Sequence, residues 1–347
     1  MDLELSEDQK VLQEAFASFF TKASGPETVR AAEPLGFDDD LWQQLVQTGA
    51  PTMAVPEDQG GGGAGFLDLV IVAQEFGKRL APVPFVESAV AANVLARTGA
   101  GVELLGGVVE GTTLPTVALQ PLVGGLARLV PAGAVAELVV ALDGADLVAL
   151  RRPGGTRPHV PAPANFGASP VADWRVDGEG VERIVLASGA DAARLHEQAR
   201  TEWKLLMAGA LDGLRSAALD IGVDYVKQRW AFGVPIGWFQ AIQHRLADVA
   251  TAGDGGRLLL YEAAWARDEG LPEADHLAAM AFLFHADLAL RTARESLQFH
   301  GGYGYTLEYD IQLYFRRAKA WPLSLGDPGL EYQRLADDLF TSPADRT

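Results

Sequence analysis

The run LVVALDGADLVAL at residues 138–150 lies in a part of the chain where helical periodicity fades. It contains two short apolar segments, residues 138–142 and 147–150, with Asp, Gly and Ala between them. Short apolar runs bounded by Gly, Pro and Asp are typical of β-strands joined by turns. Similar runs occur at residues 116–119 and 181–186. The sequence therefore predicts a small β region near the middle of the chain.

On both sides of this region, apolar residues fall at helical spacing. Residues 5–105 indicate several amphipathic helices, and the C-terminal half indicates five helical segments, at residues 193–230, 240–268, 272–298, 307–320 and 328–340. Gly253, Gly255 and Gly256 are expected to kink the second of these or to weaken its start. The expected fold is α+β but mainly α. It has an N-terminal helical domain (1–107), a small middle β-barrel or sheet domain (108–190) and a C-terminal four-helix bundle (191–347).

Composition excludes several classes of function. The 347 residues carry a formal net charge of -18, which disfavours nucleic acid as a partner because phosphate backbones would be repelled. No cysteine is present, so disulfides and thiolate chemistry are excluded. The six histidines form no metal-ligand pattern, and we predict no metal site. No segment has the character of a signal peptide or a membrane span, so we expect a cytoplasmic protein with no membrane partner.

Three separated segments carry a family resemblance. The first has an opening at residues 3–10 (LELSEDQK), followed by VPEDQGG at 55–61 and EFGK at 75–78. The second is YVKQRWAFG at 225–233, continued by PI and FQAIQHRLAD up to residue 248. The third is QFHGGYGYTLE at 298–308, with RRAK at 316–319. In this order and spacing, across nearly the whole chain, they resemble the acyl-CoA dehydrogenase family.

The resemblance implies an FAD enzyme that dehydrogenates the α,β bond of an acyl-CoA thioester and passes electrons to an electron-transferring flavoprotein. It implies two sets of FAD contacts, which reach one FAD from two different subunits: Arg229, Phe232 and Gln240 in one set, and Gln298, Gly301 and Gly302 in the other. The residue types suit this role. A guanidinium meets a phosphate as a fork of donors, an aromatic ring offers a face to adenine, and glycine lets backbone approach a phosphate. Taken singly, each residue also has an ordinary structural role, such as a surface ion pair or a helix cap.

The catalytic base departs from the family pattern. Family members use a Glu to remove the α-proton, and the usual position matches Leu325, which cannot take a proton. The alternate position, before the first long helix of the bundle, matches Trp203. Its neighbour Glu202 is a candidate base, although one residue of shift turns a helix by about 100°. Asp327 is a weaker candidate, and an ordinary surface carboxylate is the alternative for both.

The β region also departs. Where the family carries a T-E-P-x-A-G-S-D-like stretch, residues 118–125 read ALQPLVGG. Both polar pairs that would touch the flavin and the substrate are missing. Contacts to the cofactor from the helical bundle are therefore kept, while the flavin-ring side and the base are lost.

Three hypotheses follow from this pattern. In the first, the chain resembles the degenerate subunit of bacterial α2β2 acyl-CoA dehydrogenases of fatty acid or steroid degradation, and shares FAD with a homologous subunit. In the second, it is a self-sufficient homo-oligomeric dehydrogenase that uses Glu202. In the third, it is a non-catalytic scaffold or acyl-CoA-binding protein. The sequence specifies neither the acyl group nor the physiological electron acceptor.

Overall fold

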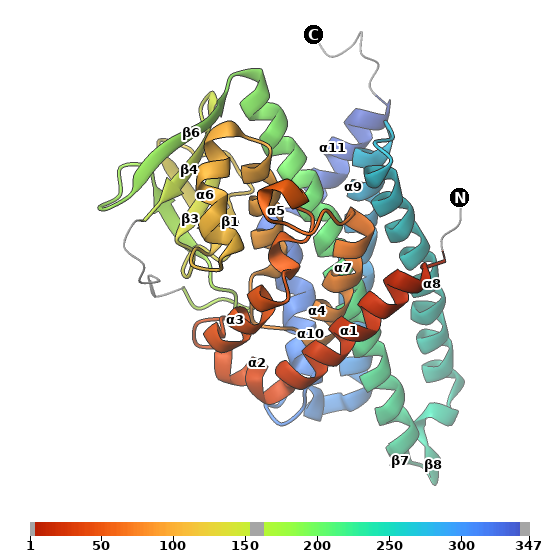
Figure 1. Cartoon of the computed structure of the whole chain (residues 1–347). Coiled ribbons are helices and arrows are strands. Elements are labelled where there is room, and N and C mark those ends of the chain that lie inside the picture. Colours follow the sequence, from red (N-terminus) through yellow and green to blue (C-terminus); the bar gives the residue numbers. More distant parts are fainter. Residues whose placement is uncertain (1–3, 153–162, 341–347) are drawn as a thin grey trace. The chain divides into compact units, whose positions relative to one another are not determined.

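The computed structural model describes residues 4–152 and 163–340, and residues 1–3, 153–162 and 341–347 lie outside that description. Helices come first along the chain, strands follow, and long helices complete it (Figure 1). The chain divides into two compact units whose segments alternate along the sequence. The first unit contains Met1–Pro26, Val70–Ala81 and Lys204–Thr347, and the second contains Glu27–Leu69 and Pro82–Trp203. We call the first the bundle unit and the second the sheet unit. The three-domain division by sequence stays a prediction.

The sheet unit combines short helices with the β-strands. Its helices are α2 (Pro26–Ala32), α3 (Asp39–Gln47), the 3-10 turns η1 (Ala50–Thr52) and η2 (Glu57–Gln59), α5 (Phe85–Ala96) and α6 (Gly99–Val109). Its strands are β1 (Pro115–Val117), β2 (Leu126–Val130), β3 (Leu138–Asp143), β4 (Asp146–Arg151), β5 (Ala172–Arg175) and β6 (Glu182–Ser188). Helix α5 packs against β1 and β3, and α6 contacts β6. The mainly helical α+β fold expected from the sequence is confirmed.

Residues 138–150 form the centre of the sheet. Strands β3 and β4 pair antiparallel from Leu138↔Arg151 to Asp143↔Asp146, in a four-stranded sheet of order β1-β3-β4-β6. Gly144 and Ala145 form the two-residue turn, and Gly144 has φ 61°. That sign at the first turn residue is what a tight hairpin of this kind requires. The apolar residues of both strands are buried except Leu142, which is half-buried at the end of β3, as expected for the central strands of a sheet.

The bundle unit contains the long helices. These are α1 (Glu7–Ala23), most of α4 (Phe66–Arg79), the larger part of α7 (Ala190–Gln228), α8 (Gln240–Asp268), α9 (Ala274–His300), α10 (Ile311–Ala320) and α11 (Pro328–Phe340). Helices α8, α10 and α11 all pack on α9. The small pair β7 (Trp230–Ala231) and β8 (Val234–Pro235) projects beyond the end of α7 (Figure 1). Turns η3 (Ile236–Trp238), η4 (Gly301–Tyr305) and η5 (Trp321–Leu325) complete the unit. No helix among the described residues is both long and apolar enough to span a membrane.

A buried polar network holds the core of the bundle unit. The Asp212 carboxylate accepts hydrogen bonds from Gln74 Nε2 at 2.8 Å and from Arg215 Nε at 2.9 Å. Burial alone would raise the pKa of Asp212, but its interactions with His285, Arg215 and Gln74 hold that pKa well below its usual range. Removing one partner of such a network leaves an uncompensated charge in the core.

Helix α8 is continuous through its glycines, and the expected kink or weakened start stays a prediction. A Cβ on Gly253 would clash with the Arg215 guanidinium, and one on Gly256 would press on Phe284 and His285. Gly255 faces open space. Two of the three glycines therefore make room for the polar network and its neighbours.

Candidate cofactor site

The end of α7 presents an arginine beside a strained turn. Arg229 follows the last residue of α7, and its backbone N–H donates to the Tyr225 carbonyl at 2.8 Å. Strands β7 and β8 then pair through a two-residue turn in which Phe232 has φ 54° and Gly233 has φ 82°. Gly233 adopts a positive φ at no steric cost, but a non-glycine residue such as Phe232 is strained in that conformation. Phe232 is therefore a non-glycine residue held in the left-handed region at the tip of the β7–β8 hairpin.

The same segment points its aromatic and cationic groups outward. The Phe232 side chain is 95% exposed, and Lys227 and Arg229 are exposed. Within the described parts of the chain, neither cation lies within ion-pair distance of a carboxylate. Residues 223–247 contain one acidic residue, Asp224, in a chain whose net charge is -18. An exposed guanidinium beside an exposed ring, in a locally basic segment, suits an anion attached to an aromatic group.

The N-terminus of α8 adds backbone donors nearby. Helix α8 begins at Gln240, and its N-cap Phe239 provides no side-chain hydrogen bond to the first turn. The rings of Phe232 and Phe239 meet edge to face with centroids 6.2 Å apart, so this helix end lies next to the strained turn. The exposed Gln240 amide and the first backbone N–H groups of the helix can therefore donate to the same anion.

The second set of predicted contacts lies at the end of α9. Gln298, Gly301 and Gly302 are exposed there. Gly301 has φ 62° and ψ -140°, a region that other residues rarely adopt. Gly302 has no positive φ, and a Cβ on it would meet nothing within 4 Å. Its own chain therefore gives no steric reason for glycine at 302, so the bare backbone suits the approach of an outside group.

The structure brings the two sets together within one chain. The Tyr225 ring, one turn before Arg229, stacks on the His300 ring with centroids 3.9 Å apart. His300 directly precedes Gly301. Both sets therefore lie at one end of the bundle unit, and the implication of the resemblance that they reach one FAD from two different subunits stays a prediction.

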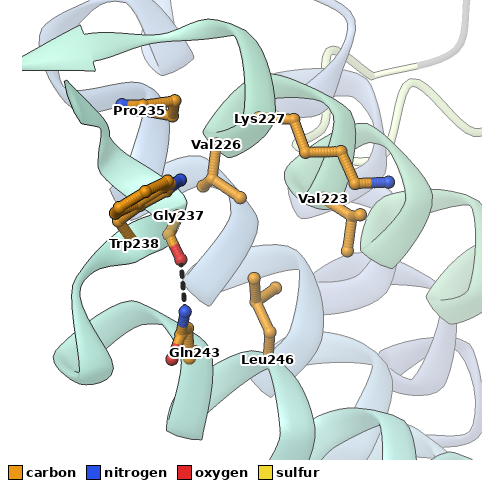
Figure 2. A pocket seen from close by; sticks show the side chains of 8 residues that line it. All are labelled: Val223, Val226, Lys227, Pro235, Gly237, Trp238, Gln243 and Leu246. Atoms are coloured by element: carbon orange, nitrogen blue, oxygen red, sulfur yellow. Dashed lines mark hydrogen bonds between the residues drawn. The ribbon is translucent and has the colours of Figure 1, made fainter.

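A pocket of about 400 Å³ opens beside these residues (Figure 2). Its lining comes from α7 (Val223, Val226, Lys227), from the connecting segment (Pro235, Gly237, Trp238) and from α8 (Gln243, Leu246). Gln243 Nε2 donates to the Gly237 carbonyl at 2.9 Å, which ties α8 to the connecting segment on that side of the pocket. Because the lining is mostly apolar with Lys227 and Gln243 at hand, the pocket suits an apolar group that has a polar edge.

The usual base position provides no carboxylate. Leu325 is buried at the end of η5, with 1% of its surface exposed. Asp327 lies two residues further along and is exposed, and its Oδ1 accepts from the Gly329 N–H at 2.9 Å. It therefore caps the start of α11, which is the ordinary role of an aspartate at such a position.

The alternate base position lies in a closed polar cluster of the sheet unit. Trp203 is fully buried, and its indole N–H donates to Glu87 Oε1 at 3.3 Å. Glu202 is also fully buried and pairs with Arg97, with 2.6 Å between Oε1 and the guanidinium nitrogen. A fully buried carboxylate that is paired in this way is shielded from a substrate. Burial raises the pKa of Glu87, and hydrogen bonds with its own backbone and with the Trp203 indole partly oppose that increase.

Residues 118–125 present apolar side chains in place of the family's polar pairs. Ala118, Leu119 and Leu122 are buried, and the Ala118 and Leu122 N–H groups bond to β3 carbonyls. His196 Nε2 donates to the Ala118 carbonyl at 2.9 Å, and burial lowers the pKa of His196. No group of three or more potential metal ligands was found among the described residues.

Three features of these sites escaped the sequence reasoning. The first is the Tyr225–His300 stack. The sequence could have placed Tyr225 near the site, because it lies four residues before Arg229 and shares one helix face with it. The Glu87–Trp203 contact joins residues 116 positions apart, and Arg97 and Glu202 are similarly distant. Such long-range pairs leave no local pattern.

Comparison with known proteins places the whole chain. Residues 6–104 match the family model described as "Acyl-CoA dehydrogenase, N-terminal domain", and residues 196–338 match "Acyl-CoA dehydrogenase, C-terminal domain". The acyl-CoA dehydrogenase IpdE2 of Mycolicibacterium smegmatis is 32% identical over 97% of this chain and 100% of its own length. A chain of the ChsE4-ChsE5 complex from Mycobacterium tuberculosis is 29% identical, with a TM-score of 0.86 over 99% of this chain and 100% of that one. A steroid acyl-CoA dehydrogenase variant, Tcur3481-Tcur3483, is 28% identical with a TM-score of 0.82, over 96% and 98% of the two chains.

Proposed function

The chain belongs to the acyl-CoA dehydrogenase family, and on that premise we propose that it is the subunit without a catalytic base in a heteromeric enzyme. In this proposal it contributes cofactor contacts to an FAD-dependent α,β-dehydrogenation of an acyl-CoA thioester. A homologous subunit supplies the base and the flavin-ring contacts. An electron-transferring flavoprotein accepts the electrons, and the cytoplasmic location stays a prediction.

One contrast supports the proposal. The groups suited to a dinucleotide phosphate are kept outward at the end of the bundle unit, including a phenylalanine held in a strained turn. Both positions where the family carries its base hold buried apolar side chains, Leu325 and Trp203. A chain with no flavin role would have no reason to retain the strained ring and the exposed cation.

The residues present would hold the cofactor as follows. Arg229 would neutralise and fork onto the pyrophosphate, Phe232 would cover the adenine, and Gln240 and Gln298 would donate hydrogen bonds. The backbone at Gly301 and Gly302 would approach a phosphate oxygen directly. FAD, when bound, supplies the acceptor for the β-hydride. This chain's own part is binding and orientation.

The relatives favour a steroid-derived acyl group as the substrate class. One similar solved structure is named as a steroid acyl-CoA dehydrogenase, and another is a two-protein complex. These descriptions belong to those proteins. Together with the missing base they support a heterotetramer that acts on a bulky acyl-CoA.

The self-sufficient alternative depends on Glu202. Its full burial and its 2.6 Å pair with Arg97 disfavour it as a base, because a base must reach the substrate α-carbon. The scaffold alternative lacks an explanation for the exposed Arg229 and Phe232. The heteromeric reading therefore accounts for more of the structure than either alternative.

Anaerobic mixing with acyl-CoA tests the proposal. The chain alone, mixed with excess FAD, is expected to give no substrate-dependent bleaching of the flavin, because it binds little flavin by itself and provides no base that reaches the α-proton. The complex with a homologous subunit is expected to bleach. Bleaching by the chain alone would overturn the proposal, and Glu202→Gln would then show whether that residue is the base.

A further inference from the structure

Two tryptophans at one end of the bundle unit expose most of their surface. Trp230 in β7 is 62% exposed, and Trp238 at the end of η3 is 71% exposed. The candidate cofactor contacts use Arg229 and Phe232 of the same segment, but neither tryptophan. Grouped, exposed aromatic side chains are typical of a surface that another molecule covers, because each ring offers a large apolar area.

The two indoles lie beside the pocket at the end of α7. Trp230 pairs directly with Pro235 across β7 and β8, and directly opposed residues of an antiparallel pair point to the same side. Pro235 and Trp238 both line the pocket (Figure 2). The other apolar side chains of its lining are Val223, Val226 and Leu246. Trp230, Pro235, Trp238 and the pocket therefore form one apolar surface, which we call the indole surface.

Positive charge accompanies the indole surface. Lys227 lines the pocket, and none of the carboxylates that the structure describes lies within ion-pair distance of its ammonium group. Asp224 is the one acidic residue between positions 223 and 247, although the whole chain has a net charge of -18. An apolar surface with an unneutralised ammonium group fits a partner that presents apolar side chains beside a carboxylate.

A second copy of this chain is a poor partner for the indole surface. In a two-fold symmetric pair the same surface of both subunits meets, so Lys227 and Arg229 would approach their own copies. Asp224 is the only carboxylate that residues 223–247 could provide in return. Like charges that meet across an interface oppose association. The indole surface therefore favours a chain of different sequence over a second copy.

We propose that the indole surface is the docking site for the homologous subunit of the complex. In this arrangement the partner inserts an apolar side chain into the pocket and pairs a carboxylate with Lys227. Because Arg229 and Phe232 belong to the same segment, docking there carries them to the partner chain. The identity of the partner rests on the proposed function, whereas the docking surface itself does not, so the two can fail separately.

Analytical ultracentrifugation measures the association without substrate. The full chain is mixed with a homologous acyl-CoA dehydrogenase chain that carries Glu at the position matching Leu325. Trp238→Ser is expected to raise the Kd of the complex about 30-fold, the scale of one central aromatic contact. Lys227→Gln is expected to raise the Kd about fivefold at low salt and less at high salt, because salt screens the lost ion pair. Val11→Ser, in the exposed face of α1, is the control and should leave the Kd unchanged.

Thermal unfolding of each variant alone first shows that it folds. Absence of a complex with the wild-type chain, or an unchanged Kd for a folded Trp238→Ser, would overturn the docking site. If Trp238→Ser does not fold, Trp230→Ser carries the same comparison from β7. A wild-type homodimer that Trp238→Ser dissociates would show that a second copy covers the surface, and would overturn the choice of partner. A complex that depends on Trp238 but binds no FAD and does not bleach with acyl-CoA would refute the proposed function and leave the docking surface intact.

Discussion

Replacement of Phe232 by glycine separates function from stability at one position. The ring is 95% exposed, so its removal loses little burial. Its backbone has φ 54°, a left-handed conformation that costs a non-glycine residue about 1–2 kcal/mol. Glycine removes that cost but adds about 0.5–1 kcal/mol of chain entropy in the unfolded state. The free energy of unfolding of Phe232→Gly should therefore stay within about 1 kcal/mol of wild type.

The same change should reduce cofactor affinity. Stacking of a base on an aromatic side chain contributes about 1–3 kcal/mol, so the Kd for FAD should rise about 5- to 150-fold. Urea denaturation gives the stability, and fluorescence titration with FAD gives the Kd, on the chain alone and with a homologous subunit. Val11→Ser removes an exposed apolar side chain from α1 and is the control. Unchanged FAD binding by a folded Phe232→Gly would refute the assignment of this ring.

The other predictions concern packing, protonation and the base. Gly253→Ala should destabilise the chain by about 1–3 kcal/mol in urea, because the new methyl group overlaps the Arg215 guanidinium. Gly255 faces open space, so Gly255→Ala should stabilise the chain by about 1 kcal/mol. Equal effects of the two substitutions would contradict this packing. Burial lowers the pKa of His196 and His300, so the unfolded chain takes up protons first and the free energy of unfolding should fall as pH drops from about 7 to 5; a flat profile over that window would be inconsistent with neutral, buried rings. Glu202→Gln should cost about 1–3 kcal/mol of stability, because its arginine partner loses its counter-charge, and should leave the turnover of the complex unchanged; a large loss of turnover in a folded variant would restore Glu202 as a base.

Much of the fold was predictable because its signals are local. The strand run at 138–150 became the β3–β4 hairpin, and the helix predicted at 240–268 has those bounds in the structure. The role of Gly253 was not predictable, because glycine has two uses in a helix. A sequence shows its low helix propensity but not the buried side chain that a partner helix places against it.

The candidate site was only partly predictable. The family motifs pointed to Arg229 and Gly301, and the structure places both at one end of the bundle unit. Whether Glu202 is paired depends on Arg97, which lies far away in the sequence. No local sequence pattern indicates that the two residues form an ion pair. Long-range pairs of this kind are set by tertiary packing, so no spacing rule could have separated a buried ion pair from a base.

The most direct test of the central claim is the flavin content per chain, from absorbance near 450 nm and protein concentration. It should be measured on the chain purified alone and after co-expression with a homologous subunit. A shared site predicts little flavin alone and about one FAD per two chains in the complex, because cofactor binding requires both subunits. One FAD per chain in the protein purified alone, bleached by acyl-CoA, would contradict the account.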